Sequence, residues 1–301
     1  MSWLIIAFIS PICHGFANVL DNHLSNNLFK NTWTLMFYSV CFSSFFLPLL
    51  FLIQVPQLPP LSSLPFVFLI AFIEVFYLYP YYKALQSDDT SVVSSLFSLG
   101  KIFVPLFAFL FIGEILKPTQ YLGFFIIILG SATLTLNNRG TLHLNKSFFY
   151  MLICSILLAV EAVTYKHLFE NNVSWSTGFF WPTLFSTIIV LPFLLVPKLR
   201  REIGSQCKEI KRVIPFFAFE ELLTFVGSAT SVYALSMVPV TLVESIGEFQ
   251  PLFVLFYAIV LHKIYPNLFR ERIDRQSIIK KILLFGIMVI GILLVIHPTK
   301  Y

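Results

Sequence analysis

Charged residues are scarce in this chain of 301 residues, and their scarcity excludes an ordinary soluble protein. Only 12% of the residues are Asp, Glu, Lys or Arg, whereas a soluble domain carries about a quarter. Hydrophobic residues make up 57% of the chain, which includes 35 phenylalanines. The net charge of +5 does not indicate a nucleic-acid partner, because the basic residues gather at the ends of apolar runs, where they meet lipid headgroups.

Motifs for catalysis, metal binding and nucleotide hydrolysis are also missing. The four cysteines show no C-x-x-C spacing and are interpreted as inert apolar side chains. No H-E-x-x-H motif, no G-x-S-x-G elbow and no P-loop occurs, and the six histidines are scattered. The sequence therefore predicts no enzyme, no catalytic residue, no metal site and no cofactor, and it excludes transport driven by ATP bound to this chain.

Long apolar runs are abundant instead. Each has about 20 residues, the length that crosses a bilayer as a helix. Ten such runs predict ten transmembrane helices, and little of the chain remains for a soluble domain. The runs are residues 3–19, 33–53, 64–84, 91–112, 120–136, 148–168, 177–196, 215–235, 241–262 and 278–296. The predicted fold class is an all-α polytopic membrane protein.

The distribution of Lys and Arg predicts the orientation. Ten spans place both termini on one side of the membrane. The loops on the opposite side hold sixteen of the 20 basic residues, and most of these lie in residues 198–212 and 263–281. The positive-inside rule makes that side cytoplasmic and places both termini outside. We expect the protein in the plasma membrane, which is the inner membrane of a bacterium.

Part of the sequence repeats at an offset of 150 residues. Ala84-Leu85 recurs at Ala234-Leu235, and five further identities follow between the fourth and ninth runs. Chance identity between apolar runs is the alternative explanation. Five spans in each half would insert the second copy upside down, which is the inverted-repeat architecture of secondary transporters. The predicted domains are a first five-helix repeat, 1–140, and a more divergent second one, 141–301.

Several segments resemble the EamA domain of the drug/metabolite transporter (DMT) superfamily. They are residues 82–85, 92–96, 105–114 and 120–131, with Gly113-Glu114 the most specific part. Residues 14–18 are similar to the first span of the family, with His14 in place of tryptophan. The resemblance implies a ten-helix transporter that moves small organic solutes by alternating access, and it does not name the solute.

The chain departs from this family pattern in three ways. The family carries proline thirteen residues before Glu114, and this chain has Lys101 there. The second half keeps Pro251 at the corresponding position, but Lys263-Ile264 replaces its Gly-Glu pair. Family members commonly have cytoplasmic termini, whereas the distribution of Lys and Arg in this chain predicts that both termini lie outside. Lys101 is therefore the best candidate for a residue that sets this protein's substrate apart from those of its relatives.

Charged residues within spans are candidate site residues, because charge is costly inside a membrane. Residues three or four apart share a helix face, so Ser94, Ser98 and Lys101 share one face, and Glu244 and Glu248 share another. The offset of 150 residues superposes the two faces. At a rise of about 1.5 Å per residue, Lys101 and Glu248 lie at depths about 5 Å apart. We therefore expect both to face one central cavity.

Other spans supply further candidates for substrate binding. These are His14, Asn18, Glu74, Tyr77, Tyr81, Glu161 and Glu221. Glu244, Glu248 and Glu74 are candidates for proton coupling, because carboxyl groups in apolar surroundings can hold a proton at neutral pH. Two alternatives stay open: Lys101 and Glu248 form a fixed salt bridge that only joins two helices, and the tyrosines form an interfacial belt.

A site with both signs of charge fits a zwitterion. The predicted function is a secondary transporter of a small polar or zwitterionic solute, such as an amino-acid-like metabolite, and coupling to protons is an open part of this prediction. One alternative is a lipid or hydrophobic-drug flippase of the same fold, with a cavity lined by phenylalanine. Another is a non-transporting scaffold with a closed bundle. The predicted partners are the solute and membrane lipid, with no nucleic acid, and the chain is predicted to act as a monomer or homodimer.

Overall fold

The computed structural model describes residues 2–29, 31–88, 90–134, 146–264 and 275–296, and all regular structure in these ranges is helical. A few side chains within the ranges, including that of Ser98, are not described. The α-helices are α1 (Ser2–His23), α2 (Thr32–Phe45), α3 (Leu64–Phe76), α4 (Leu78–Leu85), α5 (Thr90–Leu96), α6 (Ser98–Lys101), α7 (Val104–Ile112), α8 (Pro118–Leu134), α9 (Lys146–Glu170), α10 (Trp175–Val190), α11 (Pro197–Leu235), α12 (Val240–Gly247), α13 (Gln250–Ile264) and α14 (Arg275–Ile296).

Short helical segments of other types adjoin some of these helices. A π-helical segment, Leu24–Leu28, continues α1, and 3-10 segments lie at Leu47–Leu52, Leu61–Ser63 and Leu191–Leu195. Side chains cap two of the longer helices: Asn31 accepts from the Trp33 amide before α2, and Ser174 accepts from the Thr177 amide before α10. Such caps satisfy amide groups that the first helical turn cannot pair.

Seven helical stretches of the described residues are long and apolar enough to cross a membrane. They are Trp3–Leu28, Thr32–Leu52, Leu61–Leu85, Lys146–Glu170, Trp175–Leu195, Val213–Leu235 and Val240–Leu261. They match the first three predicted runs and the sixth to the ninth. The predicted fifth and tenth runs form α8 and α14, which contain the shorter apolar helices Pro118–Gly130 and Gly286–Val295. The prediction of an all-helical membrane protein is confirmed.

The predicted count of ten spans in two repeats is not confirmed by these helices. The fourth run, residues 91–112, is divided into α5, α6 and α7, none of which could cross a bilayer of about 30 Å alone. The predicted boundary between the repeats, at residues 140 and 141, lies outside the described residues.

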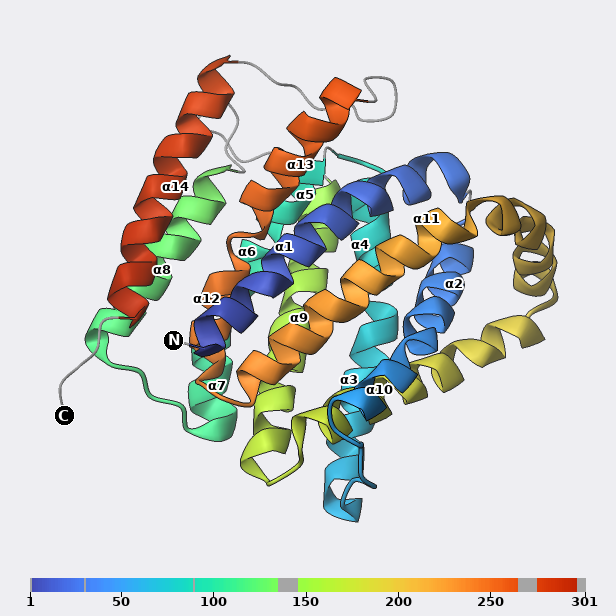
Figure 1. Cartoon of the computed structure of the whole chain (residues 1–301), viewed down its shortest axis with the longest axis horizontal. Coiled ribbons are helices and arrows are strands. Elements are labelled where there is room, and N and C mark those ends of the chain that lie inside the picture. The colour runs from blue at the N-terminus through green and yellow to red at the C-terminus, as the bar shows by residue number, and fades with distance from the viewer. Residues whose placement is uncertain (1, 30, 89, 135–145, 265–274, 297–301) are drawn as a thin grey trace.

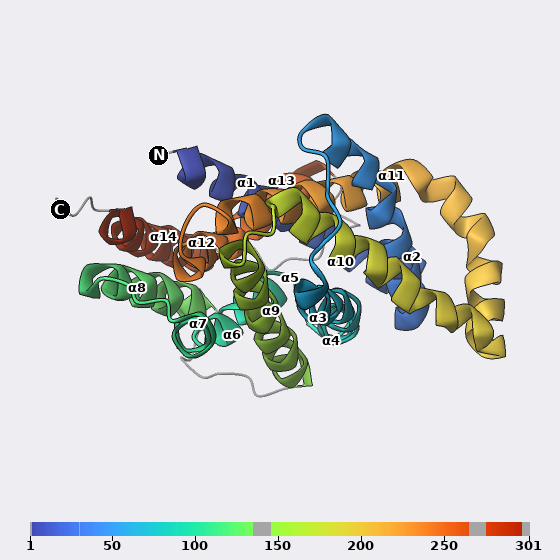
Figure 2. The ribbon, with the colours of Figure 1, turned by 90° about the horizontal axis from the view of Figure 1, so that it is seen from below.

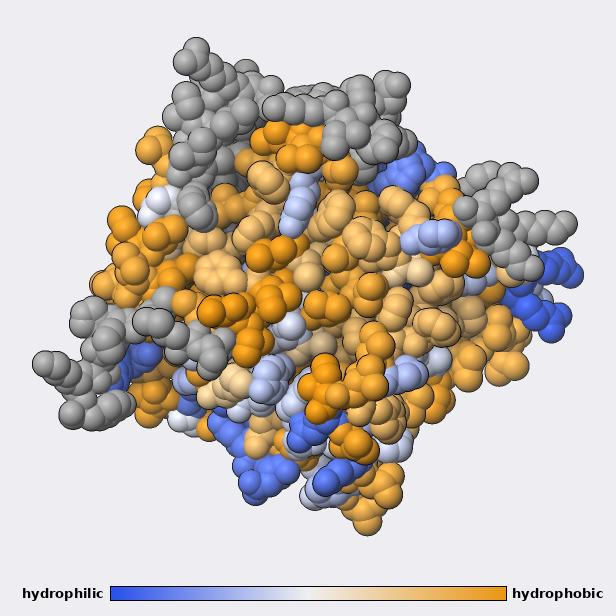
Figure 3. All heavy atoms as spheres, in the orientation of Figure 1, coloured by the Kyte–Doolittle hydropathy of each residue, from blue (hydrophilic) through white to orange (hydrophobic). Residues whose placement is uncertain are grey.

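The surface suits a lipid environment. Figure 3 shows one face of the molecule, where apolar residues cover the middle and hydrophilic residues gather mainly toward the lower and right-hand edges. Large apolar side chains are well exposed, among them Phe111 at 68% and Leu52 at 83%. Such exposure would be unfavourable in water and is ordinary for a chain surrounded by lipid.

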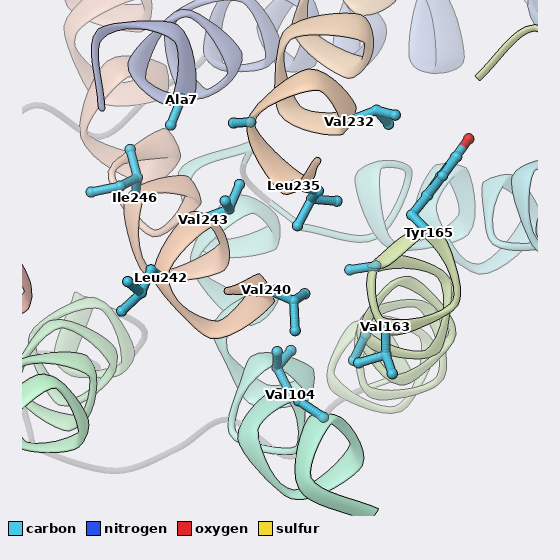
Figure 4. Close-up of a cluster of buried hydrophobic side chains, with 14 of the residues drawn as sticks. Ala7, Val104, Val163, Tyr165, Val232, Leu235, Val240, Leu242, Val243 and Ile246 are labelled. Atoms are coloured by element: carbon cyan, nitrogen blue, oxygen red, sulfur yellow. The ribbon is translucent and has the colours of Figure 1, made fainter. Parts of the chain in front are cut away.

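Inside the molecule, small and branched apolar side chains fill the space between helices. Figure 4 shows Ala7, Val104, Val163, Val232 and Val240 in one buried cluster that joins α1, α7, α9, α11 and α12. In a membrane the lipid tails are as apolar as these side chains, so close packing rather than burial from water holds the helices together.

The helices pack in two similar sets. α1 lies along α11 and contacts α12 and α13, whereas α9 lies along α3 and α4 and contacts α5, α6 and α7 (Figure 1). α8 and α14 pack against each other at one end of the molecule in both ribbon views (Figures 1 and 2). α2 and α10 pack against each other and against α11 and α3, respectively.

Three of the apolar runs are interrupted near their middle. The helix breaks lie at Tyr77 between α3 and α4, at Phe97 between α5 and α6, and at Glu248 and Phe249 between α12 and α13. Pro105 follows a further break in the run that contains Phe97, at Ile102 and Phe103 between α6 and α7, and Pro251 follows the break at Glu248 and Phe249. Proline has no amide hydrogen, so the carbonyl four residues earlier, in Lys101 or Gly247, loses its helical partner. These proline positions help to explain why both helices are discontinuous.

Candidate functional site

A cavity of about 250 Å³ lies among the described helices and is lined by both halves of the chain. The three interrupted helices contribute Tyr77, Phe97 and Gly247 to its wall, and α1, α9 and α11 form much of the rest. Seven carboxyl groups line it: Asp21, Glu74, Glu161, Glu220, Glu221, Glu244 and Glu248. This volume is slightly below that of cavities for drug-sized ligands and suits a smaller polar molecule.

Lys101 lies against the C-terminus of α12. Its Nζ is 3.4 Å from Glu244 Oε2, 3.4 Å from Glu248 Oε1 and 3.3 Å from the carbonyl oxygen of Glu244. Glu248 is 2% exposed. These are the two ion pairs seen among the described residues. The ammonium group has three hydrogens, so the three contacts account for its full donor capacity.

The end of α12 is suited to holding this ammonium group. Carbonyl groups of the last helical turn lack partners and carry partial negative charge, and Lys101 donates to one of them. Gly247 leaves the necessary room, because a Cβ at that position would lie 2.5 Å from Lys101 Nζ. The proximity of Lys101 to Glu248 and Glu244, expected from helical periodicity, is therefore present in the structure.

A second polar group extends from α3 and α9. Tyr165 donates a hydrogen bond of 2.9 Å to Glu74 Oε1, and Glu161 lies one helical turn before Tyr165. Oε2 of Glu161 is buried without a hydrogen-bond partner in the described structure. His14 lines the cavity from α1, where Gly227 of α11 makes room for its ring: a Cβ at Gly227 would lie 2.8 Å from His14 Nε2.

A third group lies between α1, α4 and α11. Tyr81 Oη is 2.8 Å from Asn18 Oδ1 and 2.9 Å from Asp21 Oδ2. Glu220 and Glu221, each 2% exposed, face Asp21 from α11 and interact electrostatically with it. Thr224 donates to Glu220 at 3.0 Å. Three carboxyl groups are thus gathered on one side of the cavity.

The structure brings together almost all the residues predicted to bind substrate. Eleven of the twelve line the cavity, and the twelfth is Ser98, whose side chain lies outside the described residues. Tyr77 and Tyr81 line the cavity rather than an interfacial belt, whereas Tyr79 stacks near Trp33. Their proximity does not by itself establish that they contact a solute.

Sequence analysis missed Asp21, Glu220, Tyr82 and Tyr165 as cavity-lining candidates. Asp21 was placed beyond the first apolar run, which was expected to end at residue 19, but α1 continues to His23. Tyr165 follows Glu161 by four residues, and this helical spacing was a usable signal. Glu220 directly precedes the predicted site residue Glu221 in the eighth apolar run, and its charge within that run was a usable signal.

Glu114 makes a separate polar contact between the two halves. Gly113 ends α7 with a positive φ of 67°, a conformation that glycine adopts without strain. The Glu114 carboxylate then accepts hydrogen bonds from the amides of Val240 at 2.7 Å and Thr241 at 3.2 Å, and from the Thr241 hydroxyl at 2.7 Å. The most specific part of the family resemblance therefore caps the N-terminus of α12.

Comparison with known proteins confirms the family resemblance for the first part of the chain. Residues 1–136 match the model of the EamA-like transporter family, a domain of the DMT superfamily. No curated protein matches this chain. A solved structure, described only as "Crystal structure of protein", aligns with a TM-score of 0.65 at 15% identity, covering 98% of this chain and 96% of that chain. At 15% identity this similarity shows a shared fold over nearly the whole chain, and it shows the fold alone.

Proposed function

We propose that this integral membrane protein, whose residues 1–136 match the EamA-like transporters, is a secondary transporter that works by alternating access. Its cargo is a small polar or zwitterionic solute such as an amino-acid-like metabolite. The observation that carries the proposal is the position of Lys101 between Glu244 and Glu248 in a cavity formed by both halves.

Two structural features support an inverted repeat of five helices. The first set of contacts, α1 with α11 to α13, has a counterpart in α9 with α3 to α7. The break at Phe97 also corresponds to Gly247 at the offset of 150 residues, and α12 ends at Gly247. Inverted repeats with discontinuous helices at a central site are typical of secondary transporters. Under this proposal α5, α6 and α7 together form the fourth span, and α8 and α14 form the fifth and tenth.

A zwitterion can exchange partners with the Lys101 ion pairs and pair both of its own charges. Its carboxylate would replace the glutamates around Lys101, while its ammonium group would pair with Glu244 or Glu248. An anion would engage only Lys101 and leave both glutamates without a cation, which is costly in a buried site, and a cation would compete with Lys101 for the same two glutamates. Exchange of ion-pair partners therefore favours a solute that carries both charges.

The lining of the cavity favours this proposal over a lipid or hydrophobic-drug flippase. Phenylalanine contributes only Phe97 and Phe179 to the described lining, which is otherwise rich in carboxyl, hydroxyl and amide groups. The cavity also distinguishes the fold from the closed bundle expected of a scaffold. We place the protein in the plasma membrane with residues 198–212 on the cytoplasmic side, and one chain supplies both walls of the cavity, so a monomer suffices.

Uptake in proteoliposomes tests this proposal. We expect purified protein to take up at least one member of a panel of radiolabelled amino acids and related zwitterions, and Lys101→Ala to reduce that uptake at least tenfold. Lys83→Ala is the control, because Lys83 lies outside the cavity lining and should leave uptake unchanged. Normal uptake by a folded Lys101→Ala protein would refute the assignment of the site.

A triple variant separates substrate contact from helix pairing. Lys101→Ala alone leaves Glu248 buried without its cation, which costs about 3–5 kcal/mol for a buried pair. Lys101→Ala with Glu244→Gln and Glu248→Gln removes that penalty. Recovery of stability without recovery of uptake supports contact with the solute, whereas recovery of both indicates that Lys101 only joins α6 to α12.

A further inference from the structure

We propose that Asp21, Glu220 and Glu221 form a proton-binding site within the cavity, separate from the Lys101 group, and that this site carries the coupling proton. The three carboxyl groups come from α1 and α11, which lie side by side (Figure 1). Their residues are 5%, 2% and 2% exposed. Proton binding is a property of these groups alone, and the coupling role rests on the transport function proposed above.

The three carboxyl groups have no cationic partner among the described residues. Both ion pairs of the described structure belong to Lys101, and they engage Glu244 and Glu248. Three ionised carboxylates in mutual contact, without a cation and out of water, are strongly unfavourable. Binding of protons neutralises such a group without bringing in another ion. Of the candidates predicted from the sequence, Glu244, Glu248 and Glu74, the first two differ, because they share Lys101 as their cation.

The hydrogen bonds of Tyr81 join Asp21 to Asn18. Its phenol oxygen lies within 2.9 Å of two acceptor atoms, Asn18 Oδ1 and Asp21 Oδ2, but a phenol has one hydrogen to donate. If Tyr81 donates to Asn18, then the contact with Asp21 requires a hydrogen on the aspartic acid. The chain of donors would run from Asp21 to Tyr81 to Asn18, and it leaves Asp21 neutral.

Unpartnered atoms in the same region agree with protonated acids. Asp21 Oδ1, Glu220 Oε2 and the Asn18 amide nitrogen are buried and lack hydrogen-bond partners in the described structure. Rotating the Asn18 amide would let its NH2 group donate to Tyr81 and Tyr81 donate to Asp21, and the Asn18 oxygen would then be the unpaired atom. An ionised carboxylate needs several donors, whereas a carboxylic acid needs fewer. No group of three or more His, Cys, Asp or Glu side chains in the described residues is arranged to hold a metal ion.

Other titratable and charged groups face this site from every neighbouring helix. The nearest are His14 of α1, Cys41 of α2, Tyr77 at the α3–α4 break, and Tyr81 and Tyr82 of α4. Across the cavity lie Glu74, Lys101, Glu161, Tyr165, Glu244 and Glu248. Hydroxyl groups support the acids directly: Thr224 bonds Glu220, and Ser39 bonds both Tyr82 and Glu221. The single lysine is engaged elsewhere, so protons are the available neutralising charge.

Infrared spectroscopy of the full-length protein in lipid measures the protonation of the three carboxyl groups directly and needs no solute. We expect a carbonyl-stretch band of protonated carboxylic acid near neutral pH, which disappears on titration to alkaline pH. Asp21→Asn and a Glu220→Gln/Glu221→Gln variant should each remove part of the band, and Tyr81→Phe should shift it. Glu170→Gln, which changes an exposed residue at the end of α9, is the control and should leave it unchanged.

Two results would overturn the proton site. One is a carbonyl-stretch band identical to that of wild type in both the Asp21→Asn protein and the Glu220→Gln/Glu221→Gln protein, provided that both remain folded. The other is loss of the wild-type band when sodium replaces choline at constant pH, which would assign the site to a metal cation.

Proteoliposomes then test coupling separately. Wild type should accumulate a zwitterion from the panel in response to a pH gradient, whereas Asp21→Asn should lose accumulation and keep exchange of labelled for unlabelled solute. If the infrared band behaves as expected and the wild type exchanges solute without responding to pH, the coupling role is wrong and the transport function stands. If no solute exchanges at all while the band behaves as expected, the transport function fails and the proton site stands.

Discussion

Removal of the Glu114 carboxylate should destabilise the protein by about 2–3 kcal/mol, because it removes the cap of α12. The loss combines three effects. Replacing a good N-terminal cap by alanine typically costs about 1 kcal/mol. A negative charge at a helix N-terminus contributes about 0.3–1 kcal/mol, and the bond from the Thr241 hydroxyl contributes about 1 kcal/mol. Glu114 is partly exposed, so water replaces some of these contacts and limits the total.

The magnitude can be measured by reversible unfolding of Glu114→Ala and Glu114→Gln in mixed micelles. Gln retains one acceptor oxygen and the shape of the side chain, so we expect it to lose about half as much stability, about 1 kcal/mol. Glu170→Ala, which removes an exposed glutamate from the end of α9, should change stability by less than about 0.5 kcal/mol.

A double-mutant cycle with Thr241→Val isolates the bond between halves. Valine keeps the shape of threonine and removes its hydroxyl group, so the coupling energy between Glu114 and Thr241 should be about 1 kcal/mol. A Glu114→Ala protein as stable as the Glu170→Ala control, or a coupling energy near zero, would refute the reasoning that Glu114 holds α7 to α12.

Three further predictions concern close packing and orientation. Gly247→Ala should abolish uptake, since its methyl group displaces the Lys101 ammonium group, and Lys101→Met should restore stability but not uptake in that background. Gly100→Ala should prevent stable folding, because the added Cβ would overlap the backbone of α9. Gly204→Ala is the matched control: nothing lies within 4 Å of the added Cβ, so this variant should stabilise α11 by about 0.5–1 kcal/mol in an unfolding assay. A membrane-impermeant maleimide should label the exposed Cys207 only from the cytoplasmic side, and labelling from outside would reverse the orientation.

Most of the site can be predicted from the sequence because helical periodicity determines which side chains share one face of a helix. Glu244 and Glu248, four residues apart, share one face of the predicted span, and the offset of 150 residues relates that face to the one bearing Lys101. Neither inference needs the tertiary arrangement. The same argument works for the apolar runs, whose length and composition predict seven of the membrane-spanning helices.

Tertiary interactions decide what the sequence could not predict. Asp21 lies past the apolar run, and only the continuation of α1 to His23 turns it toward Glu220 and Glu221. The break at Phe97 also has no proline of its own, and Gly100, three residues later, packs against the backbone of α9. Pro105 lies eight residues later, so the sequence pattern indicates a distortion in this span without locating its start. Glu114 is recognisable as part of a family motif, but its partners at residues 240 and 241 come from the other half.

The interrupted helices also affect how such a protein can evolve. At each break, backbone carbonyl and amide groups lose their helical partners and become available to the cavity, and their polarity does not depend on which side chains are present. A side chain near a break can therefore be replaced while backbone groups at the break still offer hydrogen bonds to polar molecules in the cavity. Lys101, which lies beside the α12–α13 break, stands where the family resemblance implies proline, and it is a residue of this kind, because it adds a charge to the cavity.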